Sequence, residues 1–100
     1  MPSSRGVKEG PQPQGVNETI HWQIDVKPPA VTGGTVTVMD TTTATDVTAG
    51  TVAGPSLASG GMLLLPALSG LEAGHNYRVA ARYGDGASTL EVYILIEAEA

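Results

Sequence analysis

A turn followed by a strand pattern, at residues 68–83, constrains the fold more than any other part of the chain. Leu71, Gly74 and Tyr77 have the spacing of a tyrosine corner, in which the tyrosine ring packs on the core and its hydroxyl bonds to nearby backbone. Beyond the corner, apolar and polar positions alternate in the order Tyr77, Arg78, Val79, Ala80, Ala81, Arg82, Tyr83. A period of two predicts a strand with one face in the core and the arginines in solvent. The stretch therefore predicts a β-protein whose corner fixes the passage between two sheets.

The same alternation predicts three other long strands, at residues 19–26, 35–40 and 88–97. Shorter segments with weaker patterns predict three more, at residues 47–52, 56–59 and 62–65. Trp22 belongs to the inward set of the first long strand and is predicted to anchor the core. Half-apolar strands with turns about every eight to twelve residues are buried most simply in two facing sheets. We therefore predict an all-β fold, a sandwich of six to seven strands, with a small closed barrel as the alternative.

Proline, glycine and threonine indicate where these strands end. Lys27, Pro28 and Pro29 are expected to end the first long strand after Val26, because proline cannot donate a hydrogen bond to a strand ladder. Residues 32–34, Thr-Gly-Gly, are expected to form a turn. The threonine-rich segment 40–46 is expected to be a loop, since its side chains can bond to their own backbone. Its two aspartates are too few to predict a calcium site.

The corner resembles the Leu-x-Pro-Gly-x-x-Tyr corner of fibronectin type III domains and related immunoglobulin-like sandwiches. Ala73 stands where that family usually has proline, so the turn is less rigid here. The resemblance implies an immunoglobulin-like or fibronectin type III-like β-sandwich of six to seven strands. It also implies that Trp22 occupies the place of the tryptophan buried between the two sheets of such folds.

The first eighteen residues differ in composition from the rest of the chain. They are rich in proline and glycine, and their apolar residues, Val7 and Val16, follow no period. A segment of this kind buries too little surface to offset its own ordering entropy. We therefore divide the chain into an N-terminal arm (1–18), either a disordered tail or an extended arm that becomes ordered on a neighbouring subunit, and a sandwich (19–100). Removal of residues 1–16 is expected to leave the fold nearly unchanged.

Residues that could carry chemistry are few. The chain has no cysteine, which excludes disulfides and thiolate metal sites. Its two histidines, His21 on a polar strand face and His75 in the corner turn, have no metal-ligand spacing and no nucleophile beside them. We therefore expect no catalytic residues, no metal, no cofactor and no enzyme activity.

Charge and hydropathy disfavour two classes of partner, nucleic acids and membranes. The net charge is −5, and no basic stripe is present to hold phosphates, so we expect no nucleic acid. The longest apolar run, residues 62–68, contains Pro66 and is too short to span a bilayer. The N-terminus has no apolar core for a signal peptide, so we expect no membrane partner and a chain made in a bacterial cytoplasm without an export signal of its own. The alternative is a module excised from a longer protein whose signal lies elsewhere.

The outward face of the last predicted strand is a candidate interface. Its inward residues supply the core, which leaves Tyr93 and Leu95 on the outward face. Two large apolar side chains at alternate positions can form an exposed patch for a partner. The candidate interface is therefore Tyr93 and Leu95 together with Val7 and Val16 of the arm. The alternative is that the arm or a loop covers the two strand residues.

The whole chain is similar in pattern to small immunoglobulin-like virion proteins of tailed bacteriophages and prophages. The shared features are the extended polar start, Trp22 in the first strong strand, the strand 36–40, the corner, and a closing strand (90–97) near the C-terminus. The resemblance implies a non-enzymatic structural protein of the virion that decorates or cements the capsid exterior or is otherwise head-associated. Its partners would be the major capsid protein, other virion proteins or further copies of itself.

A second class of function is a carbohydrate- or receptor-binding module of a bacterial or phage surface or tail protein. An exposed aromatic platform would favour that class, and Tyr93 is the one candidate for it in the sequence.

Overall fold

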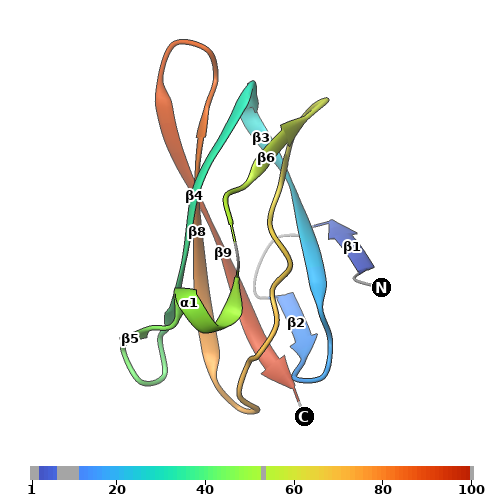
Figure 1. Cartoon of the computed structure of the whole chain (residues 1–100), viewed down its shortest axis with the longest axis vertical. Coiled ribbons are helices and arrows are strands. Elements are labelled where there is room, and N and C mark those ends of the chain that lie inside the picture. Colours follow the sequence, from blue (N-terminus) through green and yellow to red (C-terminus); the bar gives the residue numbers. More distant parts are fainter. Residues whose placement is uncertain (1–2, 7–11, 53, 100) are drawn as a thin grey trace.

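The computed structural model describes residues 3–6, 12–52 and 54–99, whose strands form two sheets (Figure 1). One sheet has the order β1 (Ser3–Gly6), β3 (Ile20–Ala30), β7 (Gly61–Leu64) and β6 (Leu57–Ser59). The other has the order β2 (Gln12–Gly15), β9 (Thr89–Glu99), β8 (Asn76–Gly84), β4 (Thr32–Asp40) and β5 (Thr45–Asp46). The prediction of an all-β fold with two sheets is confirmed. The described strands form two separate sheets and do not close into the alternative barrel.

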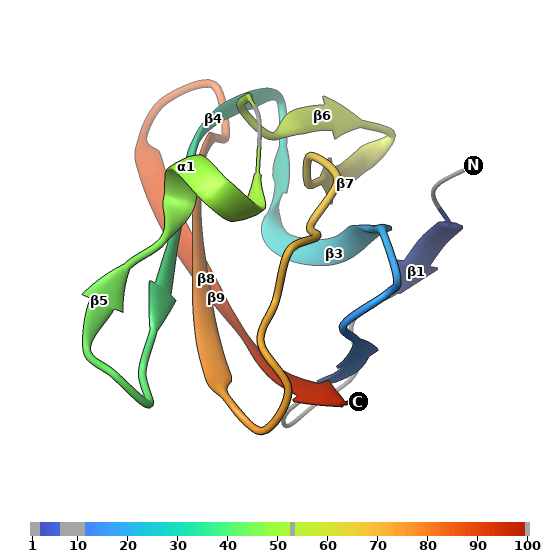
Figure 2. The same cartoon turned by 60° about the horizontal axis from the view of Figure 1, so that its bottom comes forward.

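The core lies between the sheets, which face each other as two layers in Figures 1 and 2. Alternate residues of the four long strands point inward, and β8 shows this most regularly, with Tyr77, Val79, Ala81 and Tyr83 all buried. The tryptophan of β3, Trp22, is 0% exposed. The antiparallel ladders β4–β8 and β8–β9 hold the centre of the five-stranded sheet and set which side chains leave its outer face.

The described part of the chain has nine strands where the sequence predicts six to seven. The additional strands are β1, β2 and β5, which have four, four and two residues. Segments this short carry no detectable alternation, because each contributes at most two residues to either face.

The expected end of the first long strand after Val26 is wrong, since β3 continues to Ala30. Its ladder with β7 is nevertheless interrupted in this region: Asp25 pairs with Met62, Ala30 pairs with Gly61, and the register shifts between the two pairs. The prolines therefore interrupt the ladder, because they have no N–H group to donate to it. The backbone nevertheless stays extended through them.

The turn expected at residues 32–34 is also wrong, because this segment belongs to β4. Gly33 pairs with Tyr83 and Val36 with Ala81, so the register of β4 against β8 shifts between them, as in a β-bulge. The buried Ser56 closes the irregularity. Its hydroxyl accepts from Gly34 N at 2.9 Å and lies 3.1 Å from both the Gly34 and Arg82 carbonyl oxygens.

The strand predicted at 47–52 is replaced by one helical turn, α1 (Thr48–Thr51). Local side-chain bonds explain the difference. Thr48 donates from both N and Oγ1 to Asp46 Oδ1, at 2.9 and 2.7 Å, and Thr51 Oγ1 donates to Val47 O at 2.9 Å. The Thr48 hydroxyl also accepts from Val38 N at 2.8 Å, so it binds the outer edge of β4. Such short-range bonds favour a turn over a strand.

The two described strands of the N-terminal segment, β1 and β2, belong one to each sheet, which differs from an arm lying apart from residues 19–100. β1 pairs parallel with β3, and β2 pairs parallel with β9. The side chain of Gln14, 1% exposed, gives the physical reason. Its Oε1 accepts from Trp22 Nε1 at 2.9 Å, and its Nε2 donates to Leu68 O at 2.7 Å and to Glu18 O at 3.2 Å. A buried amide with these partners fixes β2 to the core.

Candidate functional site

The corner before β8 has the geometry of a tyrosine corner. The Tyr77 ring is 2% exposed, and its hydroxyl accepts a hydrogen bond from Glu72 N at 2.8 Å. Gly74 has φ of 80°, a left-handed conformation that favours glycine, and Leu71 is buried beside the core. Burial raises the pKa of the Tyr77 phenol, so the hydroxyl stays neutral at physiological pH.

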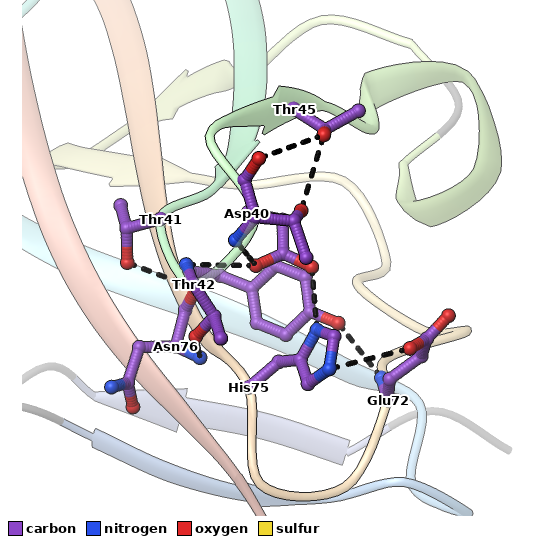
Figure 3. Close-up of polar contacts among 9 residues, drawn as sticks. Asp40, Thr41, Thr42, Thr45, Glu72, His75 and Asn76 are labelled. Atoms are coloured by element: carbon purple, nitrogen blue, oxygen red, sulfur yellow. Dashed lines mark hydrogen bonds and ion pairs between the residues drawn. The ribbon is translucent and has the colours of Figure 1, made fainter.

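A polar cluster extends from this corner to the end of β4 (Figure 3). His75 lies between two carboxylates: its Nδ1 is 2.7 Å from Asp40 Oδ2, and its Nε2 is 3.5 Å from Glu72 Oε2. Asp40 Oδ1 also accepts from the backbone N–H groups of Thr42 and Thr43, at 3.0 and 3.2 Å. We call Asp40, Glu72 and His75 the corner cluster.

Neutral hydrogen bonds join the same two segments beside the corner cluster (Figure 3). Thr41 donates from N and Oγ1 to Asn76 O, at 2.8 and 3.0 Å. Asn76 N in turn donates to Thr42 Oγ1 at 2.9 Å. The turn after β4 is therefore attached to the start of β8 by both neutral and charged contacts.

The corner cluster does not have the arrangement of a catalytic triad. Both ring nitrogens of His75 face carboxylates, so neither is directed at a hydroxyl nucleophile. Within residues 3–6, 12–52 and 54–99, no group of three or more histidine, aspartate or glutamate side chains could hold a metal ion. The contacts of His75 connect the end of β4 to the corner before β8.

A second feature is the outer face of β8 and β9. Tyr93 is 54% exposed and Leu95 is 47% exposed. The register places Ala80 opposite Tyr93 and Arg78 opposite Leu95, and the guanidinium carbon of Arg78 lies 5.2 Å from the centre of the Tyr93 ring. We call Tyr93, Leu95, Arg78 and Ala80 the outer-face patch. It is a short apolar and aromatic surface with one cation, on the central ladder of the sheet.

The outer-face patch is bordered by polar groups at both ends. At one end Arg82 Nε lies 3.3 Å from Glu91 Oε2. A hydrogen bond from the Tyr93 hydroxyl is the main reason that the pKa of the Glu91 carboxyl lies below its usual value, and the bond from Arg82 is the second. At the other end Leu95 lines a hollow of about 230 Å³ together with Thr41, Asn76 and Glu97. An apolar centre with a polar rim is typical of protein-binding surfaces.

The remaining predicted interface residues do not join this patch. Val16 is half-buried against the core, and its N–H donates to Glu99 O at 2.8 Å. Val7 lies outside the described residues. Of the four predicted interface residues, Tyr93 and Leu95 are therefore the pair that the structure brings together in solvent, and no described part of the N-terminal segment covers them.

His21 lies on a separate surface formed by the other sheet. Its Nδ1 is 3.1 Å from Leu65 O, and the ring lines a mostly apolar hollow of about 420 Å³ that also includes Leu57, Leu64 and Pro66. No acidic partner of His21 is found among the described side chains, in contrast to His75.

The sequence did not identify Gln14, Asp40 and His75 as partners in specific contacts. The Asp-Thr-Thr-Thr segment signals only that Asp40 can bond to nearby backbone, which it does. The contact of Asp40 with His75 spans 35 residues and that of Gln14 with Leu68 spans 54, and no local pattern could point to either.

Comparison with protein-family models, with curated proteins and with solved structures finds no match to this chain. In the described part of the molecule, no helix has the length and apolar character needed to cross a membrane.

Proposed function

We propose that this protein is a non-enzymatic structural component of a tailed bacteriophage particle. In this proposal it decorates or cements the capsid exterior, with the major capsid protein or another virion protein as partner. The observation that carries the proposal is the outer-face patch, where Tyr93 and Leu95 remain exposed on β9, whose residues 89–97 pair with β8. A rigid sheet face with apolar anchors binds protein at little ordering cost.

The immunoglobulin-like or fibronectin type III-like assignment belongs to the same proposal. Two features support it: the Tyr77 hydroxyl bonded to backbone five residues upstream, and Trp22 buried between the sheets. The parallel pairing of β1 with β3 departs from a purely antiparallel sandwich.

The first test is mass spectrometry of purified particles released from the host that encodes the chain, after prophage induction. The chain is expected among the virion proteins. Its absence from particles that contain every other structural gene product of the same phage would overturn the proposal.

The second test assigns the contact surface. Particles that lack the protein are mixed with wild-type chain or with the double variant Tyr93→Ser/Leu95→Ser, and attachment is measured by co-sedimentation. We expect the double variant to bind about tenfold or more weakly, because a few anchor residues, tyrosine prominent among them, carry most of the binding energy of such interfaces. Leu57→Ser is the matched control, since Leu57 is 63% exposed on the other sheet. Loss of attachment in the control but not in the double variant would move the interface to that sheet.

The alternative function is binding of a carbohydrate or receptor by a surface or tail protein. Tyr93 favours it, because the other three aromatic residues of the chain are buried, which leaves Tyr93 as its one exposed ring. Glycan-array binding that is lost in Tyr93→Ala and kept in Leu95→Ala would support this alternative over the capsid role.

A further inference from the structure

The corner cluster joins two segments that are far apart in the sequence. Asp40 ends β4, whereas His75 lies in the corner before β8, and their side chains meet at 2.7 Å (Figure 3). The Asp40 side chain is 6% exposed and that of His75 is 24% exposed. The contact is therefore sheltered enough to be ordered and open enough for the ring to exchange protons with solvent.

The bonding of Asp40 determines which nitrogen of His75 carries a proton. Asp40 Oδ1 accepts from two backbone N–H groups, and Oδ2 faces His75 Nδ1. An ionised carboxylate only accepts hydrogen bonds, so Nδ1 must donate and carries hydrogen in the neutral ring. The titrating position is then Nε2, which lies 3.5 Å from the Glu72 carboxylate. A proton added there meets a second negative charge.

We propose that the corner cluster is a pH-dependent latch, in which protonation of His75 at Nε2 tightens the attachment of the turn after β4 to the corner before β8.

The charged side chains that face the ring are both acidic: Asp40 from β4 and Glu72 from the corner. From β8 the ring of Tyr77 stacks on it, with centroids 6.5 Å apart, and stays neutral in this pH range. The hydrogen bond to Asp40 raises the pKa of His75 against the opposing effect of partial burial. The same bond is the main cause of the lowered pKa of Asp40.

These two directions set the pH window of the latch. A raised His75 pKa gives stability that is complete below the ordinary value of 6.5 and is lost as the pH rises through the folded-state value. A lowered Asp40 pKa gives stability that is complete above the ordinary value of 3.8 and is lost as the pH falls through the folded-state value. The latch is therefore strongest in mildly acidic solution and weaker on the alkaline side.

The neutral bonds between Thr41, Thr42 and Asn76 do not titrate and hold the turn at every pH. The change is thus a graded tightening of one junction, and it should appear as a pH-dependent difference in stability without loss of the fold.

The test compares wild-type full chain with His75→Gln, which can still donate a hydrogen bond to Asp40 but cannot take up a proton. Thermal midpoints are measured at about pH 5.5 and about pH 8, on either side of histidine titration. We expect the midpoint of wild type to exceed that of the variant by more at the lower pH. Glu72→Gln is the control for the exposed carboxylate and should keep most of this difference, because Asp40 makes the closer contact.

A direct readout follows the His75 ring itself. Proton-detected NMR of the ring signals of His75, with His21→Gln used to separate the two histidines, should give a titration midpoint above the ordinary value, and Asp40→Asn should lower it. A wild-type midpoint at or below the ordinary value, or a stability difference between wild type and His75→Gln that is the same at both pH values, would overturn the proposal.

Discussion

Replacing Gln14 by methionine should destabilise the protein markedly, although Gln14 lies in a segment with no apolar pattern. The buried amide bonds to the indole of Trp22 and to the carbonyl oxygens of Leu68 and Glu18. Methionine keeps the unbranched shape, so little cavity is created, but it is only a weak acceptor and donates nothing. The variant therefore removes three hydrogen bonds without changing the volume of the core.

The magnitude follows from which partners lose their bonds. The carbonyl oxygen of Leu68 loses the bond from Gln14 but still accepts from Ile20 N at 3.1 Å, so it keeps one hydrogen bond. The indole N–H of Trp22 loses its buried acceptor, and a buried donor left in this way costs about 1–3 kcal/mol. A loss of about 2 kcal/mol lowers the thermal midpoint of a domain of this size by about 8–16 °C.

Urea unfolding followed by tryptophan fluorescence is the appropriate assay, because Trp22 is the chain's single tryptophan. Circular dichroism on the same samples guards against a change confined to the fluorophore. Gln23→Met, the same chemical change at a half-exposed position of β3, is the matched control and should stay within about 0.5 kcal/mol of wild type. If Gln14→Met is as stable as that control, the bond between the amide and the indole does not stabilise the fold.

Deletion of residues 1–16 is a larger change that also removes the bonds of Gln14. It removes β1, β2 and Gln14 together, so the unfolding free energy should fall by more than in Gln14→Met. The expectation from sequence, that this deletion leaves the fold nearly unchanged, is therefore reversed. An unaltered urea midpoint for the truncated chain would show that the N-terminal strands add nothing to the sandwich.

Two further changes test the corner and the irregular part of β4. Tyr77→Phe leaves the Glu72 N–H without its acceptor and should cost about 1 kcal/mol or more in unfolding free energy, measured in urea; an unchanged midpoint would mean that the hydroxyl does not fix the corner. Gly33→Ala places a Cβ 1.9 Å from Ser56 O, a backbone atom, and should cost about 1–3 kcal/mol, whereas Gly50→Ala meets no atom within 4 Å and should be neutral or slightly stabilising. Equal thermal midpoints for the two alanine variants would contradict the close approach at Gly33.

The sequence predicts the long strands because their apolar and polar residues alternate from one position to the next. β8 is the clearest case: its buried and exposed residues follow the pattern of the sequence from Tyr77 to Tyr83. The helical turn at Thr48–Thr51 was missed because the segment alternates weakly as a strand would, while its shape depends on bonds from threonine hydroxyls. The period of the apolar residues predicts which side chains are buried, but it does not predict which hydroxyl group bonds to which oxygen.

The candidate site was predicted only where exposure follows from strand phase. Tyr93 and Leu95 were assigned to the outward face because the opposite phase of β9 fills the core, and both are exposed. The Asp40–His75 contact depends on two turns meeting across 35 residues, which is a property of the whole sandwich. The role of Gln14 was hidden for a different reason, since a single polar residue in a proline-rich segment gives no sign of burial, although its partner Trp22 is only eight residues away.

The register shift in β4 affects how copies of this chain behave at high concentration. A strand edge with free backbone groups can recruit a strand from another molecule and start aggregation. β5 covers only Met39 and Asp40 of the outer edge of β4. In β4, Ser56 already bonds both N and O of Gly34, through its own backbone N–H and its hydroxyl, and Val38 bonds to Thr48 Oγ1 and Val47 N. At these positions an incoming strand finds its hydrogen-bonding sites taken and a bent backbone. Many copies could therefore stand close together without joining through β4 into a continuous sheet.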